Sequence, residues 1–153
     1  MHRLHRRVLP SLLTLLATLA LTAGAALVGA APASAVTTRE AAMLTKINNA
    51  RAASGLRPLV LSAELSAVAR SHSGQMASVT ALFHTSSFSS ICCWSAIAEN
   101  VGTGDSVRGV HRAFLRSSTH RSNILDRRMR QVGVGIVATG GRVWVTEIFR
   151  RPS

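Results

Sequence analysis

The closing segment of the chain restricts the fold more than any other feature. Residues 131–138 alternate valine and isoleucine with glycine and valine, and residues 143–149 are again mostly apolar. Between them, Thr139-Gly140-Gly141-Arg142 has the composition of a hairpin turn, because glycine adopts the positive φ angles that tight turns need. Both strands of this hairpin are apolar on both faces. A sheet that contains them must therefore be covered on both sides.

The preceding segments supply helices that can cover such a sheet. Residues 37–53 open with a Thr-x-x-Glu capping box, and residues 62–76 carry an apolar stripe at helical spacing. A third helix begins after residue 105, and residues 118–125 form a short helical turn. Residues 79–104, rich in serine and glycine, are expected to be irregular. This order predicts an α+β fold, namely a three-layer α-β-α sandwich with a mainly antiparallel central sheet.

Residues 1–35 have the pattern of a secretory signal peptide. Three arginines precede an apolar run that ends in Ala33-Ser34-Ala35, a small-residue cleavage pattern. Cleavage would leave residues 36–153 as one domain, with its core at about 40–150 and no transmembrane segment in the mature protein. The alternative is an uncleaved anchor helix, because the apolar run approaches the length that spans a bilayer. We expect a secreted, extracellular protein.

The charge of the chain favours anionic partners. The whole sequence has a formal net charge of +12, and removal of the three leader arginines leaves about +9. A field of this sign attracts cell-wall polymers or acidic lipids, so anionic cell-envelope components or lipid are the expected partners. Aromatic residues make up only 4% of the chain, and no base-stacking motif is present, so we expect no specific nucleic-acid partner.

The two cysteines, Cys92 and Cys93, are adjacent. Export would bring them into an oxidising compartment, but neighbouring residues form a disulfide only with difficulty because their Cα atoms are close together. The sequence leaves three alternatives open: two partly buried thiols, a bridge between the two neighbours, or a bridge to another molecule.

Sequence motifs of common enzymes do not occur. The chain has no G-x-S-x-G elbow, no phosphate-binding loop, no H-E-x-x-H and no paired carboxylates at obvious spacing. A Ser–His dyad assembles in space rather than in sequence, so Ser86 or Ser118 stays open as a nucleophile. The sequence leaves open whether the protein is an enzyme, and it favours a non-enzymatic role.

Several short strings occur in order between residues 40 and 150. They are an opening helix with Asn48 and Arg51, the second-helix segment 67–77, Phe83-His84, Ala98-Glu99-Asn100-Val101-Gly102, residues 117–125 around His120-Arg121, and the closing hairpin. Together these strings resemble the CAP superfamily of cysteine-rich secretory, antigen 5 and pathogenesis-related proteins (SCP-like), in particular its short bacterial secreted members.

The resemblance implies an α-β-α sandwich with a central cleft lined by two histidines and acidic residues, which in many relatives holds zinc or another divalent cation. His84, Glu99 and His120 match three members of this set and are the expected cleft, ligand and metal residues. For the fourth, Asp105 is the only acidic residue between Gly102 and His120. Secondary candidates for the cleft are Asp105, Glu147, Asn100 and Arg121. His72 and His111 lie on or beside apolar helix stripes and are expected to be packed residues.

Three functions follow from this interpretation. The first is a secreted, non-enzymatic binding module whose cleft holds a small molecule, a lipid or a divalent cation. The second is a secreted, protease-like hydrolase that uses a His/Glu or metal–water centre. The third is a structural or defence-type interaction protein in which the cleft residues serve only stability.

Overall fold

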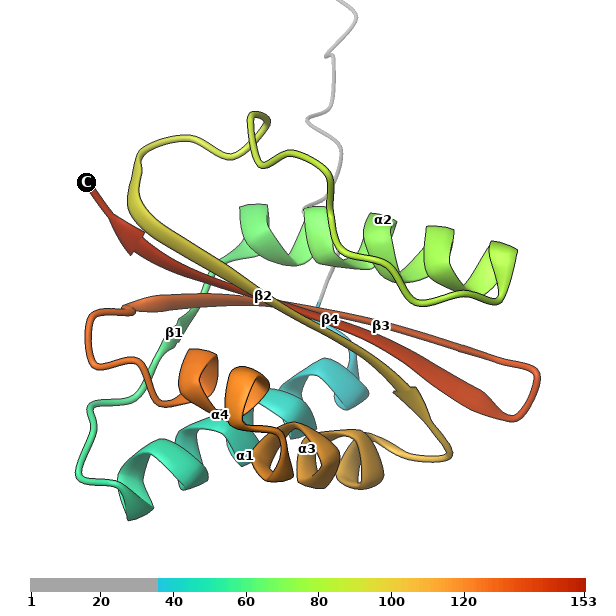
Figure 1. Ribbon diagram of the computed structural model, residues 1–153, viewed down its shortest axis with the longest axis horizontal. Coiled ribbons are helices and arrows are strands. Elements are labelled where there is room, and N and C mark those ends of the chain that lie inside the picture. Colours follow the sequence, from blue (N-terminus) through green and yellow to red (C-terminus); the bar gives the residue numbers. More distant parts are fainter. Residues whose placement is uncertain (1–35) are drawn as a thin grey trace, which may run out of the picture. The chain divides into compact units, whose positions relative to one another are not determined.

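The computed structural model describes residues 36–153, so the predicted signal peptide lies outside the described residues. Four helices and four strands follow one another along the domain (Figure 1). In chain order they are α1 (Thr38–Ala53), β1 (Val60–Leu61), α2 (Ala63–Val79), β2 (Trp94–Gly104), α3 (Val107–Arg116), α4 (Ser118–Ile124), β3 (Gln131–Thr139) and β4 (Arg142–Pro152). Within this part of the chain, no helix is both long enough and apolar enough to cross a bilayer.

The strands form one sheet in the order β1-β3-β4-β2. β4 pairs antiparallel with both β2 and β3, whereas the two-residue β1 pairs parallel with the start of β3. Helix α2 covers one face of the sheet, and α1, α3 and α4 cover the other (Figure 1). The prediction of a three-layer α-β-α sandwich with a mainly antiparallel sheet is confirmed, and the parallel β1 makes the sheet mixed.

The contact between α2 and β3 is unusually close because β3 presents glycine there. A Cβ atom at Gly133 or Gly135 would collide with the α2 backbone. β1 pairs with β3 only at Gln131 and Val132. Beyond these two residues, the close approach lets serines of α2 form hydrogen bonds to the β3 backbone. Ser66 Oγ accepts the Val134 amide at 3.2 Å, and Ser73 Oγ donates to the Gly135 carbonyl at 2.9 Å. Side chains thus satisfy groups that would otherwise form an open sheet edge.

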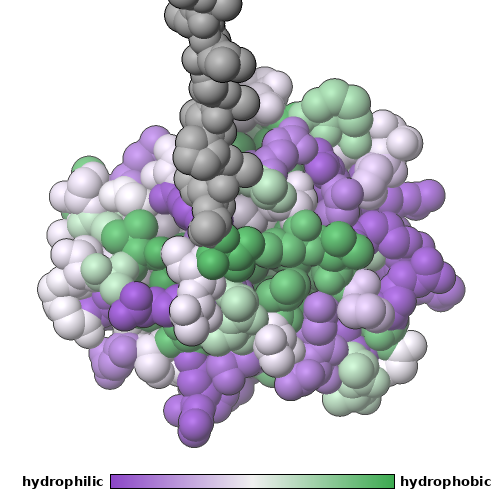
Figure 2. All heavy atoms as spheres, turned by 180° about the vertical axis from the view of Figure 1, so that it is seen from behind, coloured by the Kyte–Doolittle hydropathy of each residue, from purple (hydrophilic) through white to green (hydrophobic). Residues whose placement is uncertain are grey.

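The main hydrophobic core lies between the sheet and the layer of α1, α3 and α4. It is built from aliphatic residues of α1, β3 and β4 together with Phe114 of α3 and Phe149 of β4. Seen from behind, apolar residues form a band across the middle of the domain with hydrophilic residues on either side (Figure 2).

Residues 79–104 are only partly irregular, which corrects the expectation from the sequence. Residues 94–104 form β2, which pairs with β4 along its whole length. The sequence did not predict this strand because Ser, Ala, Asn and Gly have low strand propensity. Pairing and burial against β4 outweigh that propensity.

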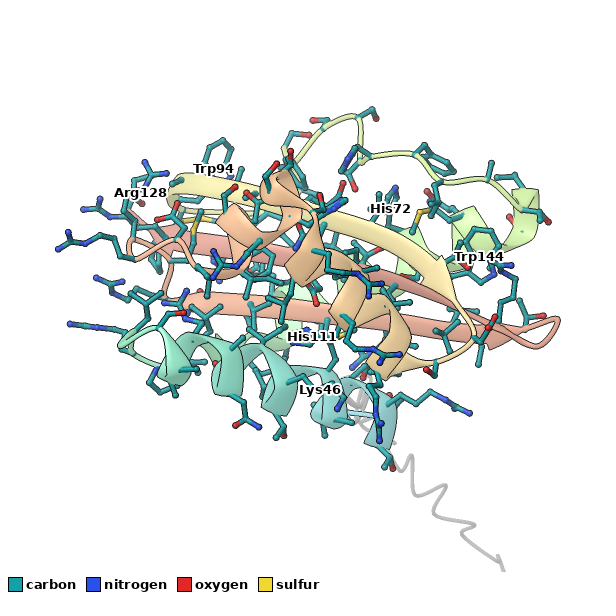
Figure 3. The ribbon with its side chains drawn as sticks, turned by 60° about the horizontal axis from the view of Figure 1, so that its bottom comes forward. Lys46, His72, Trp94, His111, Arg128 and Trp144 are labelled. Carbon is teal, nitrogen blue, oxygen red and sulfur yellow. A yellow bond between two sulfur atoms is a disulfide. The ribbon has the colours of Figure 1, made fainter. Side chains whose placement is uncertain are left out.

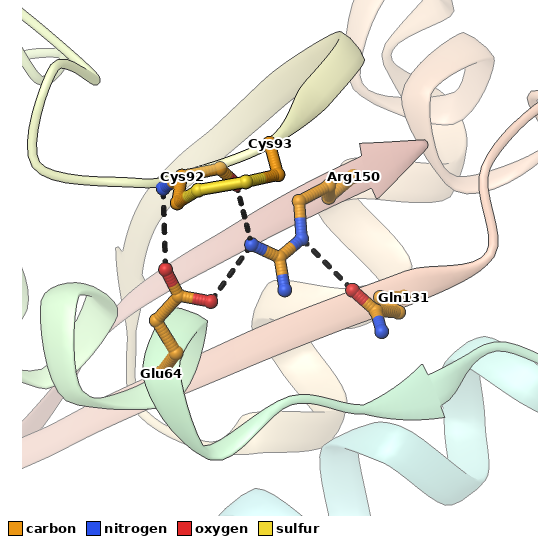
Figure 4. The surroundings of a disulfide bond; sticks show 5 residues. All are labelled: Glu64, Cys92, Cys93, Gln131 and Arg150. Carbon is orange, nitrogen blue, oxygen red and sulfur yellow. Dashed lines mark hydrogen bonds and ion pairs between the residues drawn. A yellow bond between two sulfur atoms is a disulfide. The ribbon is translucent and has the colours of Figure 1, made fainter. Parts of the chain in front are cut away.

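Cys92 and Cys93 form a disulfide with each other, so the second of the three alternatives is present. Polar contacts fix the bridge at the start of β2 (Figure 4). The Cys92 amide donates to Glu64 of α2 at 3.3 Å, and its carbonyl accepts from Arg150 of β4 at 2.9 Å. Arg150 also binds Glu64 at 2.7 Å and Gln131 at 2.8 Å. This network joins the long loop to both α2 and the sheet.

Candidate functional site

The candidate site lies at the outer edge of the sheet, where β2 has no further strand beside it. Neighbouring residues of a strand point to opposite faces. Glu99 therefore turns towards α2 and the loop of residues 80–93, and Asn100 turns towards α4. The helical layers on the two faces of the sheet thus both contact β2 at these two residues.

Glu99 is the centre of a network of hydrogen bonds. Its carboxylate accepts His84 Nδ1 at 2.7 Å and the Thr85 amide at 3.0 Å, both on Oε2, and the Thr85 hydroxyl at 2.6 Å on Oε1. The Glu99 side chain is only 4% exposed, whereas that of His84 is 61% exposed. Because a carboxylate only accepts, the shared proton belongs to Nδ1. The buried carboxylate therefore fixes the orientation of a solvent-facing imidazole ring.

His72 joins the same network from below. Its Nδ1 lies 3.5 Å from Glu99 Oε1 and 3.2 Å from the hydroxyl of Thr146 in β4. The ring of Phe83 meets the His72 ring edge-on, with the ring centres 5.0 Å apart. His72 lies between the sheet and the long loop (Figure 3). His72 is buried, as expected of a packed residue, and its Nε2 has no hydrogen-bond partner within the described residues. The apolar stripe of α2 concealed its contact with Glu99.

Asparagines hold α4 against β2 on the other face. Asn100 Nδ2 donates to the carbonyl of His120 at 3.1 Å and to Glu147 at 3.0 Å. Asn123 Nδ2 donates to the side chain of Asn100 at 2.9 Å and to the carbonyl of Glu99 at 3.2 Å. These bonds fix the backbone of His120 relative to Glu99, so Asn100 positions the site from beneath.

His120 reaches the same edge of the sheet from α4. Its ring lies against Phe114 with the ring centres 5.0 Å apart. The pKa of His120 is lowered by burial and, to a smaller extent, by the charge of His84. His120 is therefore neutral at pH 7.

Asp105 lies apart from this group, and Glu147 is joined to it only through Asn100. Glu147 is fully buried on the face of the sheet opposite to Glu99, and burial raises its pKa to about 8. Asp105 lines a separate hollow of about 410 Å³ between the start of α3 and the β3–β4 turn, together with Arg39 and Arg142. Arg121 is exposed on α4 and makes no ion pair within the described residues.

A second hollow, of about 380 Å³, lies beside Glu99 between α2 and the long loop. Two of its lining residues, His72 and Thr85, also contact Glu99. The lining is rich in hydroxyl groups and contains no carboxylate, lysine or arginine: Ala67, Val68, Ser71, His72, Gln75, Thr85, Ser87 and Ser90. Such a surface suits a polar, uncharged ligand that forms hydrogen bonds.

The donor groups do not fit a resident zinc ion in this arrangement. Glu99 serves as acceptor for His84 and Thr85, and a zinc site needs at least three protein ligands that converge on one point. Among residues 36–153, no three His, Cys, Asp or Glu side chains are grouped so that they could hold a metal ion. We therefore assign no step to a metal, and binding of zinc or another divalent cation stays a prediction.

The fold and the motif residues at its edge define a class, the SCP-type sandwich domain. An extracellular Bacillus anthracis protein containing an SCP domain has a TM-score of 0.65 and 21% identity, covering 72% of this chain and 39% of that one. An outer surface protein of Borrelia burgdorferi gives 0.69 and 15%, covering 78% and 96%. Venom allergen-like protein 4 of Schistosoma mansoni gives 0.66 and 10%, covering 76% and 90%.

A comparison with curated proteins gives no match. The model of the cysteine-rich secretory protein family, CAP, matches residues 44–149, and the chain belongs to this family. The resemblance inferred from the sequence is therefore confirmed. The chain spans well under half of the Bacillus protein's length.

Proposed function

We propose that the protein is an exported, non-enzymatic binding module that holds a small polar ligand beside Glu99. The observation that carries the proposal is the oriented His84 ring. An exposed imidazole fixed by a buried carboxylate is preorganised to bind a ligand, because little side-chain freedom is lost on binding. The adjoining hollow, lined by hydroxyl groups, provides room for the rest of the molecule.

Export is part of this proposal and has separate support. The leader has the composition of a secretory signal, and similar structures come from proteins described as extracellular or as outer surface proteins. The Cys92–Cys93 disulfide is of a kind that persists in oxidising compartments.

The arrangement of hydroxyl groups favours binding over hydrolysis. Thr85 donates its hydroxyl proton to Glu99 and not to an imidazole. Thr146, the hydroxyl nearest to His72, is fully buried and out of reach of a substrate. Within residues 36–153, neither Ser86 nor Ser118 makes a side-chain hydrogen bond to a histidine ring, so no nucleophile is activated by a base as a serine hydrolase requires.

One observation favours the hydrolase as a second candidate. Glu99 holds His84 Nδ1 at 2.7 Å, the orientation in which a carboxylate prepares an imidazole to accept a proton from water at its other nitrogen. This candidate predicts turnover of peptide or ester substrates that His84→Ala abolishes. Full turnover in that variant would remove His84 from the mechanism.

The test is a ligand titration of residues 36–153 followed by ¹H–¹⁵N spectra. The probes are N-acetylglucosamine as a polar neutral sugar, a lysophospholipid as a lipid, and zinc chloride. We expect the sugar to shift the amides of Thr85 and Ser87 and to lose this effect in His84→Ala. The matched control is Leu82→Ala, an exposed residue of the same loop.

The three probes separate the proposals. A local response to zinc alone would replace the sugar site by a metal site, and a response to the lipid alone would replace it by a lipid site. No response near Thr85 from a folded domain would contradict the binding module and favour the purely structural role.

A further inference from the structure

Most acidic side chains of the domain are already paired with a basic side chain. Glu40 pairs with Arg70, Glu64 with Arg150 and Asp126 with Arg128, and Glu99 binds His84. Glu147 is buried, and its raised pKa keeps it protonated near pH 7. Within residues 36–153 this leaves Asp105 as the one acidic side chain that has neither an ion pair nor full burial, although arginines are abundant on the surface.

Four of the arginines without an ion pair within residues 36–153 lie on α3 and α4. Arg108, Arg112 and Arg116 follow one another at intervals of four residues along α3, and Arg121 follows in α4. All four are exposed, and residues 106–125 contain no acidic residue. We call these four residues the arginine row.

The row points away from the core. Val110, His111 and Phe114 fill the inner face of α3, and Arg112 and Arg116 occupy the opposite face at helical spacing. Helices α3 and α4 lie on the outside of their layer, so nothing in the described part of the chain covers this face (Figure 3). Like charges four residues apart destabilise a helix, so folding alone does not explain the row.

We infer that the arginine row binds a linear phosphodiester polymer of the cell envelope. Four residues of α-helix rise about 6 Å, which places the guanidinium groups of Arg108, Arg112 and Arg116 at a spacing suited to the repeated phosphates of an extended chain. Arginine binds phosphate oxygens through paired N–H donors. This surface is separate from the proposed ligand site at Glu99 and does not depend on it.

Two other anionic partners fit the row less well. A bilayer surface would also need exposed apolar side chains, but Val79, Leu82, Phe83 and Trp94 lie on α2, the long loop and β2 rather than on α3 or α4. A nucleic acid would gain from aromatic rings on which its bases stack. The aromatic residue of this layer, Phe114, is buried in the core.

The experiment measures binding of residues 36–153 to poly(glycerol phosphate), single-stranded oligo(dT) and phosphatidylglycerol vesicles. The test variant is Arg112→Gln/Arg116→Gln. Glutamine and arginine have similar helix propensity, so this variant should fold and melt at or above the wild-type temperature. The matched control is Arg57→Gln/Arg151→Gln, which removes the same charge from exposed positions outside α3 and α4.

The expected loss follows from counterion release. At about 50 mM salt each phosphate contact contributes roughly eightfold in affinity, so the test variant should bind poly(glycerol phosphate) about 60-fold more weakly. Its affinity should also depend less on salt. The control should stay within about threefold of wild type, because its arginines contribute only through the overall field.

Four results would overturn the inference. An equal loss in the control variant would mean that net charge and not the row is responsible. If oligo(dT) bound more tightly than poly(glycerol phosphate), the partner would be a nucleic acid. If the vesicles bound more tightly than poly(glycerol phosphate), the partner would be a membrane surface. Failure of wild-type protein to bind poly(glycerol phosphate) at low salt would exclude the partner altogether.

Discussion

Replacing Glu147 by glutamine should change how the stability of the domain depends on pH. Glu147 lies fully buried in β4, and burial raises its pKa from 4.5 to about 8, although a hydrogen bond from Asn100 acts in the opposite direction. In the unfolded chain the carboxyl group is exposed and titrates near its ordinary value. Between these two pKa values the folded protein holds a proton that the unfolded protein has released.

The sign and size of the effect follow from this difference. The stability linked to the bound proton is fully present below pH 4.5 and is lost as the pH rises towards 8, because the unfolded state then binds fewer protons. Each pKa unit corresponds to 1.36 kcal/mol, so the total loss is about 5 kcal/mol. That is a large part of the stability of an ordinary small domain, which is roughly 5–15 kcal/mol.

Urea unfolding followed by tryptophan fluorescence measures this loss, because Trp144 is buried and reports on the core. Glutamine has the shape of glutamic acid but does not ionise. Between about pH 5 and pH 8.5 the free energy of unfolding of Glu147→Gln should therefore gain about 4 kcal/mol relative to wild type. His111 and His120 are present in both proteins, so their titration cancels in the comparison.

Parallel pH profiles for the two proteins would refute the reasoning. They would mean that Glu147 titrates alike in the folded and unfolded states, and hence that the carboxyl group is not as buried as the structure describes. A variant that is less stable by the same amount at every pH would show only a lost hydrogen bond.

Three further predictions concern other parts of the domain. Burial lowers the pKa of His111 and of His120, so the free energy of unfolding of Glu147→Gln should fall as the pH decreases below 6.5, in the same urea assay. Gly135→Ala should destabilise by about 3 kcal/mol or more because its Cβ meets the α2 backbone, whereas Gly74→Ala in open space should stabilise by up to about 1 kcal/mol; urea unfolding compares them. Arg51→Met leaves three backbone carbonyls without their donor and should cost about 2–3 kcal/mol, measured by thermal unfolding.

The sequence predicted those parts of the fold in which local signals agree with the tertiary structure. The capping box of Thr37 and Glu40 begins α1 as expected, and Ser62 caps α2. The turn at Gly140-Gly141 joins β3 to β4, and both glycines have positive φ angles. In each case the determining contacts lie within a few residues, so the pattern in the sequence contains them.

The parts that were missed depend on contacts distant in the sequence. β2 forms because β4 lies beside it, with Asn100 opposite Glu147 across the pair. His72 looks like an ordinary core residue of α2, and only the folding of β2 and β4 against that helix brings Glu99 and Thr146 to it. No period or spacing within one segment could have indicated these contacts.

The same two residues of β2 serve both the candidate site and the fold. Glu99 bonds to the long loop on one face, and Asn100 bonds to α4 and β4 on the other. Substitution of either leaves buried polar groups without partners and therefore lowers stability whatever the ligand is. His84 differs, because its side chain is 61% exposed and contributes little to packing. It is therefore the position at which a loss of binding can be separated from a loss of folding, and experiments on the function of this domain should begin there.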